Sequence, residues 1–246
     1  MKAITSASES FRVERALTFY GHGNQTLICE HEAYVSEGQT RFGEARVLNQ
    51  DQLVSVLRSF SSAMEVVPRV MHPRVLVSAP ALFAWWMPAG RRIHRFDVDW
   101  HKGVEGRDRL QGRTANLPHP ALVFFQLGID ARTTHVFALE RNERPSEDTK
   151  LFRAPFLNVN TDGWVCWGST PLPKGNIATT FSQVEESFFV STFSHLNNGA
   201  MVRAKDKGTY EFLADLCDNP PETYPTEVLI EHGSLQQVVT NMSRRG

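Results

Sequence analysis

The N-terminal part of the chain carries short runs in which apolar and polar residues alternate. Turns that contain glycine, GHGNQ and SEGQ, separate these runs, a pattern typical of β-strands. The pattern predicts strands within ALTFY, TLICEHEAYV and RFGEARVL. Apolar residues then recur at helical spacing at Leu53, Val54, Leu57 and Phe60, and Asn49 stands where an N-cap is expected. A strand meander followed by one helix is therefore predicted.

Apolar runs then continue with RVLVSA and ALFAWWM, which each predict a strand, and a turn at residues 88–90 leads into RRIHRFDV. Residues 101–119 are polar and show no period, so we expect an exposed loop or linker there. ALVFFQLGI and THVFALE predict a hairpin, and LFRAPFLNV predicts a further extended segment.

Two helices are expected in the last third of the chain. Their apolar stripes consist of Phe181, Val184, Phe188 and Thr192, and of Tyr210, Leu213, Ala214 and Cys217. Residues 220–246 are expected to form a tail with a short strand or helix. Runs of strands followed by runs of helices favour the α+β class.

Composition restricts the classes of function. The chain has 246 residues, 41% of them hydrophobic, and a net charge of -1. This balance is ordinary for a soluble protein and gives no bulk attraction for nucleic acid, so the basic stretches Arg69–Arg74 and Gly90–Arg95 are interpreted as solvated faces. The N-terminus lacks the apolar stretch of a secretory signal, and no apolar run suits a membrane span, so neither is expected.

The three cysteines, Cys29, Cys166 and Cys217, are widely separated. Their spacing matches neither a disulfide framework nor a zinc site, and a reducing, cytoplasmic location is predicted. The histidines lack ligand spacing and no nucleotide-binding motif occurs, so no metal and no cofactor are expected. A free cysteine is either buried filler or a reactive thiol.

The segment PFLNVNTDGWVCWGSTPLPK, residues 155–174, carries the candidate chemistry. The turn formers from Asn160 to Gly163 predict a loop that brings Cys166 to a surface. Asn158 lies eight positions before the cysteine, from where its side-chain N–H can donate to a developing oxyanion.

This segment resembles the active-site region of ubiquitin-conjugating enzymes. Those enzymes carry a His-Pro-Asn element, a polar turn that ends in glycine, a hydrophobic residue and the acceptor cysteine. Here Asn158, Gly163 and Cys166 have the same spacing without a gap, whereas Phe156 and Leu157 stand in place of the family's His-Pro. The resemblance implies an antiparallel meander with flanking helices.

With Phe156-Leu157 in these positions, the chain resembles a bacterial branch of the superfamily whose members also lack the upstream histidine. This branch is protein B of the ParB-related, ThiF-related (PRTRC) cassette, which is often plasmid-borne. Members of that branch have a histidine after the cysteine, and His195 matches that position. The implied organisation is a β-rich extension over residues 1–100, a loop or linker over 101–119, a conjugating-enzyme-like core over 120–219 and a tail over 220–246.

The resemblance implies that a ThiF-like adenylating enzyme passes a ubiquitin-like protein to Cys166, and that an amine acceptor then attacks the thioester. Asn158 would stabilise the oxyanion, and His195 would orient Asn158, deprotonate the amine, or do neither. Trp164 and Trp167 flank the cysteine as candidate partner-binding residues, although core packing is the alternative for at least one.

Other interpretations stay open. Asn158 can simply satisfy loop backbone groups, and His195 can complement a helix dipole. The whole chain can be a non-catalytic interaction module of the same fold, which the change at Phe156-Leu157 favours. A cysteine hydrolase that uses Cys166 and His195 is a third hypothesis, without a recognisable signature around the cysteine.

Overall fold

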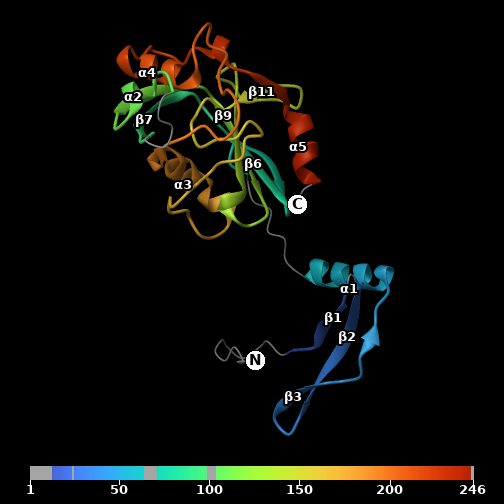
Figure 1. The fold of residues 1–246 in the computed structure, drawn as a ribbon. Coiled ribbons are helices and arrows are strands. Elements are labelled where there is room, and N and C mark those ends of the chain that lie inside the picture. Colours follow the sequence, from blue (N-terminus) through green and yellow to red (C-terminus); the bar gives the residue numbers. More distant parts are fainter. Residues whose placement is uncertain (1–12, 24, 64–70, 99–103, 245–246) are drawn as a thin grey trace. The chain divides into compact units, whose positions relative to one another are not determined.

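Two units make up the chain, Met1–Val70 and Met71–Gly246 (Figure 1). The computed structural model describes residues 13–23, 25–63, 71–98 and 104–244. The division falls earlier than the boundary expected at residue 100, because the strands that follow residue 71 pair with those of the second unit. No helix in these described ranges is both long and apolar enough to cross a membrane.

The first unit contains the predicted strand meander and helix. Its strands are β1 (Arg15–His22), β2 (Gln25–Ser36), β3 (Gln39–Phe42) and β4 (Arg46–Val47), with β2 paired to the other three. Helix α1 (Gln50–Ala63) follows. Asn49 caps this helix, since its Oδ1 accepts from the Gln52 backbone N–H at 2.9 Å while Gln52 Oε1 accepts from the Asn49 N–H at 3.0 Å. The N-cap prediction is confirmed.

The second unit is built on an antiparallel sheet with the order β13-β11-β10-β9-β6-β5. Its strands are β5 (Val75–Ala79), β6 (Leu82–Met87), β9 (Leu122–Leu127), β10 (Thr134–Ala138), β11 (Lys150–Arg153) and β13 (Glu231–Ser234). The predicted β9–β10 hairpin is confirmed, with the 3-10 turn η1 (Ala131–Thr133) between its strands. Sheet and helices together confirm the α+β class.

Helices cover both faces of this sheet. Phe124 of β9 packs in the cluster that contains the apolar stripe of α3 (Ile177–Val190), whereas Phe125 packs with α5 (Leu235–Ser243). Neighbouring residues of a strand point to opposite faces, which explains why the β9 sequence is apolar almost throughout. Residues 220–246 are therefore more than a tail, because they contain the turn η2 (Thr226–Val228), an edge strand and a core helix.

A second, smaller sheet has the order β12-β7-β8, with β7 (Gly90–Phe96), β8 (Thr114–His119) and β12 (Thr192–Phe193). Strand β12 runs parallel to β7. The expected loop at 101–119 is corrected for its described part, residues 104–119, which holds α2 (Arg107–Leu110) and β8. Strand β8 lies at the sheet edge, where a proline such as Pro118 is tolerated, and it therefore lacks the usual strand pattern.

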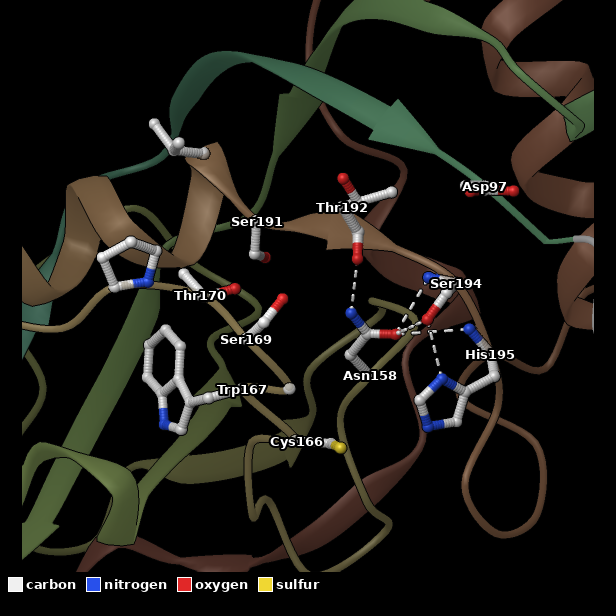
Figure 2. Close-up of a pocket in the computed structure, with 13 residues that line it drawn as sticks. Asp97, Asn158, Cys166, Trp167, Ser169, Thr170, Ser191, Thr192, Ser194 and His195 are labelled. Carbon is white, nitrogen blue, oxygen red and sulfur yellow. Dashed lines mark hydrogen bonds between the residues drawn. The ribbon is translucent and has the colours of Figure 1, made fainter.

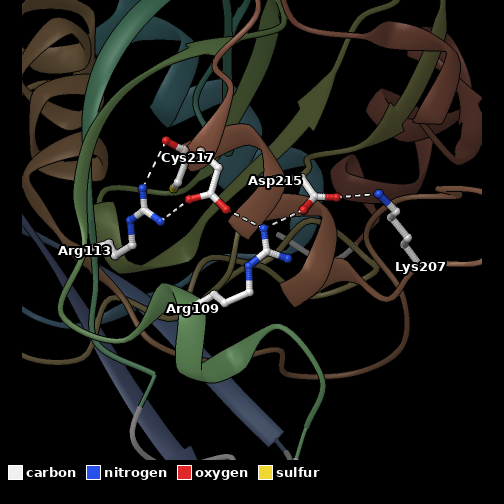
Figure 3. Close-up of polar contacts among 6 residues, drawn as sticks. Arg109, Arg113, Lys207, Asp215 and Cys217 are labelled. Atoms are coloured by element: carbon white, nitrogen blue, oxygen red, sulfur yellow. Dashed lines mark hydrogen bonds and ion pairs between the residues drawn. The ribbon is translucent and has the colours of Figure 1, made fainter.

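Helix α4 (Thr209–Asp218) packs on α2 and β8, as expected from its apolar stripe. Ion pairs join these elements (Figure 3): Arg109 contacts Asp215 at 2.7 Å and also Asp218, and Arg113 contacts Asp218 at 2.5 Å. Hydrogen bonds from Lys207 and Arg109 lower the pKa of Asp215, and those from Arg109 and Arg113 lower the pKa of Asp218.

Candidate functional site

The expected turn before Cys166 is a tight hairpin. Val159 and Val165 bridge across it, and the Gly163 N–H donates to Asn160 O at 2.9 Å. Gly163 has φ 88°, and a Cβ there would lie 2.5 Å from Cζ of the buried Phe137. The hairpin is fastened to β10 by Val165 N–H to Thr134 O at 3.0 Å. Glycine is therefore needed for both its backbone conformation and its lack of a side chain.

Cys166 follows this hairpin directly and is partly buried. Its N–H donates to Asn158 O at 2.7 Å, so that the two residues face each other across the hairpin. Both line a cavity of about 380 Å³, which also borders His195 (Figure 2). The structure thus brings together the three residues that sequence reasoning assigned to catalysis.

Asn158 connects the cysteine hairpin to the segment after α3. It has φ 63°, a left-handed conformation that asparagine tolerates, and is only 6% exposed. Its Nδ2 donates to Thr192 O at 2.7 Å, and its Oδ1 accepts from the backbone N–H groups of Ser194 at 2.9 Å and His195 at 3.2 Å. Its own N–H donates to His195 O at 2.7 Å.

His195 lies after β12 instead of at a helix C-terminus, because α3 ends at Val190. Thr192, which was expected on the helical stripe, begins β12 instead. The parallel pairing of β12 with β7 directs the chain over Asn158. The helix-dipole interpretation of His195 therefore does not apply.

The two tryptophans beside Cys166 differ in exposure. Trp164 is 38% exposed, whereas Trp167 is 4% exposed and packs edge-on against Phe188 with ring centroids 6.3 Å apart. Only Trp164 presents its ring to solvent, and core packing accounts for Trp167.

Phe156 and Leu157, which replace the histidine and proline of the resembling family, are both buried. The Phe156 ring stacks on Phe193 with centroids 5.7 Å apart and meets Phe188 edge-on at 5.1 Å. Aromatic packing thus holds the segment that leads to Asn158 where a histidine would otherwise stand.

Sequence reasoning missed Ser194 and Asp97. Ser194 Oγ lies 3.0 Å from Asn158 Oδ1 and 2.8 Å from His195 Nδ1. Its position next to His195 was the available signal. Asp97 lines the cavity only because β7 pairs with β12, which no local pattern indicates.

The other two thiols are shielded. Cys29 and Cys217 are buried, and burial raises the pKa of Cys217 to about 11. Within the described residues, no group of three or more His, Cys, Asp or Glu side chains could hold a metal ion.

Comparison with known proteins adds one finding. The model of a family described as prokaryotic E2 family D matches residues 49–232. No curated protein and no solved structure matches the chain. The matched range includes the whole candidate site.

Proposed function

The chain belongs to prokaryotic E2 family D, and on this premise we propose that Cys166 carries a ubiquitin-like protein as a thioester. Family membership supports a role related to ubiquitin-like conjugation. The observation that carries this proposal is that Cys166, Asn158 and His195 line one cavity although they come from two separate segments of the chain. Such convergence of a nucleophile with polar groups is expected of a transferase site.

In the first proposed step, the Cys166 thiolate attacks the carbonyl carbon of a thioester held by a ThiF-like adenylating enzyme. A C–S bond to Cys166 forms, and the thiolate of the donor leaves. Cysteine is nucleophilic enough to react through its minor thiolate fraction, so a dedicated base is not required at this step. The donor and the modifier are those of a PRTRC-type cassette, in which this chain would act as protein B.

In the second step, an acceptor amine attacks the Cys166 thioester, and the Cys166 thiolate leaves. Asn158 already uses one Nδ2 hydrogen on Thr192 O, so its second Nδ2 hydrogen would donate to the oxyanion. His195 would take the proton that the amine loses. Trp164, with its exposed ring beside the cysteine, would contact the modifier.

A second candidate is a non-catalytic interaction module. Phe156 and Leu157 stand where ubiquitin-conjugating enzymes carry a histidine-proline pair, and both are buried in the aromatic core. The fold is therefore held without that pair, which supports this second candidate.

A charging assay separates the two candidates. The protein is mixed with the adenylating enzyme, its ubiquitin-like protein and ATP, and the products are resolved on a non-reducing gel. The carrier predicts a thiol-sensitive adduct that disappears in Cys166→Ala and persists in Cys29→Ala and Cys217→Ala. With partners shown to be active, the absence of any adduct would favour the interaction module.

Alkylation provides an independent measurement. Cys166 should react with iodoacetamide before Cys217, because Cys217 is buried and its pKa is raised to about 11. Peptide mass spectrometry measures both rates. A Cys166 that reacts no faster than Cys217 would count against the carrier.

A further inference from the structure

The hydroxyl of Ser194 lies between the side chains of Asn158 and His195. Its Oγ is 3.0 Å from Asn158 Oδ1 and 2.8 Å from His195 Nδ1 (Figure 2). A serine hydroxyl has one hydrogen. The two contacts therefore cannot both be donated by Ser194, and the direction of one determines the direction of the other.

The orientation of the Asn158 amide is fixed by backbone groups. The backbone carbonyl oxygen of Thr192 can only accept a hydrogen bond, so the Asn158 amide atom 2.7 Å from it is the nitrogen. The backbone N–H groups of Ser194 and His195 can only donate, so the atom they contact is Oδ1. These neighbours leave no freedom to exchange the two ends of the amide.

Because Asn158 Oδ1 only accepts, the hydroxyl hydrogen of Ser194 is donated from Ser194 Oγ to Asn158 Oδ1. The hydroxyl then offers a lone pair to His195, and the Nδ1 atom 2.8 Å away must be the donor. A neutral imidazole protonated at Nδ1 carries its lone pair at Nε2.

We propose that Ser194 is a positioning residue that holds neutral His195 in the tautomer protonated at Nδ1. Its consequence for catalysis rests on the proposed function. When the acceptor amine attacks the Cys166 thioester, the N–C bond forms, the C–S bond breaks and the thiolate leaves. His195 Nε2 receives the proton released by the amine nitrogen. The opposite tautomer would have a hydrogen on Nε2 and could not accept this proton.

The tautomer is measured without any partner. Long-range proton–nitrogen NMR of the full chain labelled on histidine distinguishes protonated from unprotonated ring nitrogens, and His195→Gln assigns the signals. We expect a protonated Nδ1 and an unprotonated Nε2 in the wild type. Ser194→Ala should shift His195 towards the Nε2-protonated form, and Ser194→Thr, which keeps the hydroxyl, should restore the wild-type signature.

Ser169→Ala is the matched control, since Ser169 is an exposed serine on the cysteine side of the cavity. It should leave the tautomer unchanged. A wild-type His195 protonated at Nε2, or a tautomer unaffected by Ser194→Ala in a variant with a native-like amide spectrum, would overturn the proposal.

The catalytic consequence is tested by single-turnover discharge of the charged protein to a free amine. Ser194→Ala should charge normally but discharge about tenfold more slowly, since one hydrogen bond corresponds to about a factor of ten in rate. Ser194→Thr should discharge at close to the wild-type rate. Equal discharge by the wild type and Ser194→Ala would refute the catalytic role. Failure of the wild type to charge would refute the proposed function, while NMR would still decide the tautomer.

Discussion

We expect the buried His94 to make the second unit less stable in acid. It lies on β7, is only 4% exposed, and its ring packs among phenylalanines that include Phe156 and Phe193. Burial, with a smaller effect from the nearby His119, lowers its pKa from 6.5 to about 3. The folded state therefore favours the neutral ring.

The direction of the effect follows from linkage. A group whose pKa is depressed by folding contributes stability above its unfolded pKa and loses it as the pH falls towards the folded pKa. For His94 this window extends from 6.5 down to about 3. A pH of 5 is about 1.5 units below the pKa of the ring in the unfolded state. The free energy of unfolding should therefore fall by about 2 kcal/mol relative to pH 7.

The assay is urea unfolding at both pH values, followed by tryptophan fluorescence. All five tryptophans belong to Met71–Gly246, so the signal reports this unit alone. Between pH 7 and pH 5, the free energy of unfolding of the His94→Leu variant should fall by about 2 kcal/mol less than that of the wild type. Each protein is compared with itself, so that any constant effect of the substitution cancels. An equal loss in the variant would refute a buried, neutral His94.

Two further changes are measured by the same unfolding assay. Gly163→Ala should destabilise the protein by about 2–4 kcal/mol, through its left-handed backbone and overlap with Phe137. Gly168→Ala, also left-handed but in open space, should cost only about 1–2 kcal/mol, and equal effects would contradict the overlap. Glu185→Ala should cost about 1–3 kcal/mol, because it leaves the buried Trp85 Nε1–H and the partly exposed Arg74 without their carboxylate partner. A loss below about 1 kcal/mol would show that the pair is solvated.

The strands of the main sheet other than β13 were predictable from their apolar runs, whereas β13 is polar and was expected only as part of a tail. The Asn49 cap was predictable from its local spacing. Strand β8 was missed because it is an edge strand that contains Pro118. Helix α5 was expected only as a short strand or helix within the tail. Its place in the core depends on packing against the main sheet, which no local pattern indicates.

The candidate site was only partly readable from sequence. The spacing from Asn158 to Cys166 is local, and the hairpin that joins them has turn residues that identify it. The contact of Asn158 with His195 spans 37 residues and depends on β12, a strand of two residues that carries no recognisable pattern. Resemblance suggested His195, and the only sequence signal for Ser194 was its place next to that histidine; its contact with Asn158 is shown by the tertiary structure.

The order in which the ribosome makes the chain gives the Asn158 contacts a further meaning. Cys166 is synthesised before Thr192, Ser194 and His195, whose backbone groups hold the Asn158 side chain. Contacts between distant segments form after local ones. A nascent chain that has emerged only as far as α3 therefore contains Cys166 but lacks the backbone groups that hold the Asn158 side chain. The pairing of β12 with β7 brings these groups to Asn158 only once translation has passed residue 195, so the surroundings of Cys166 are completed late in folding.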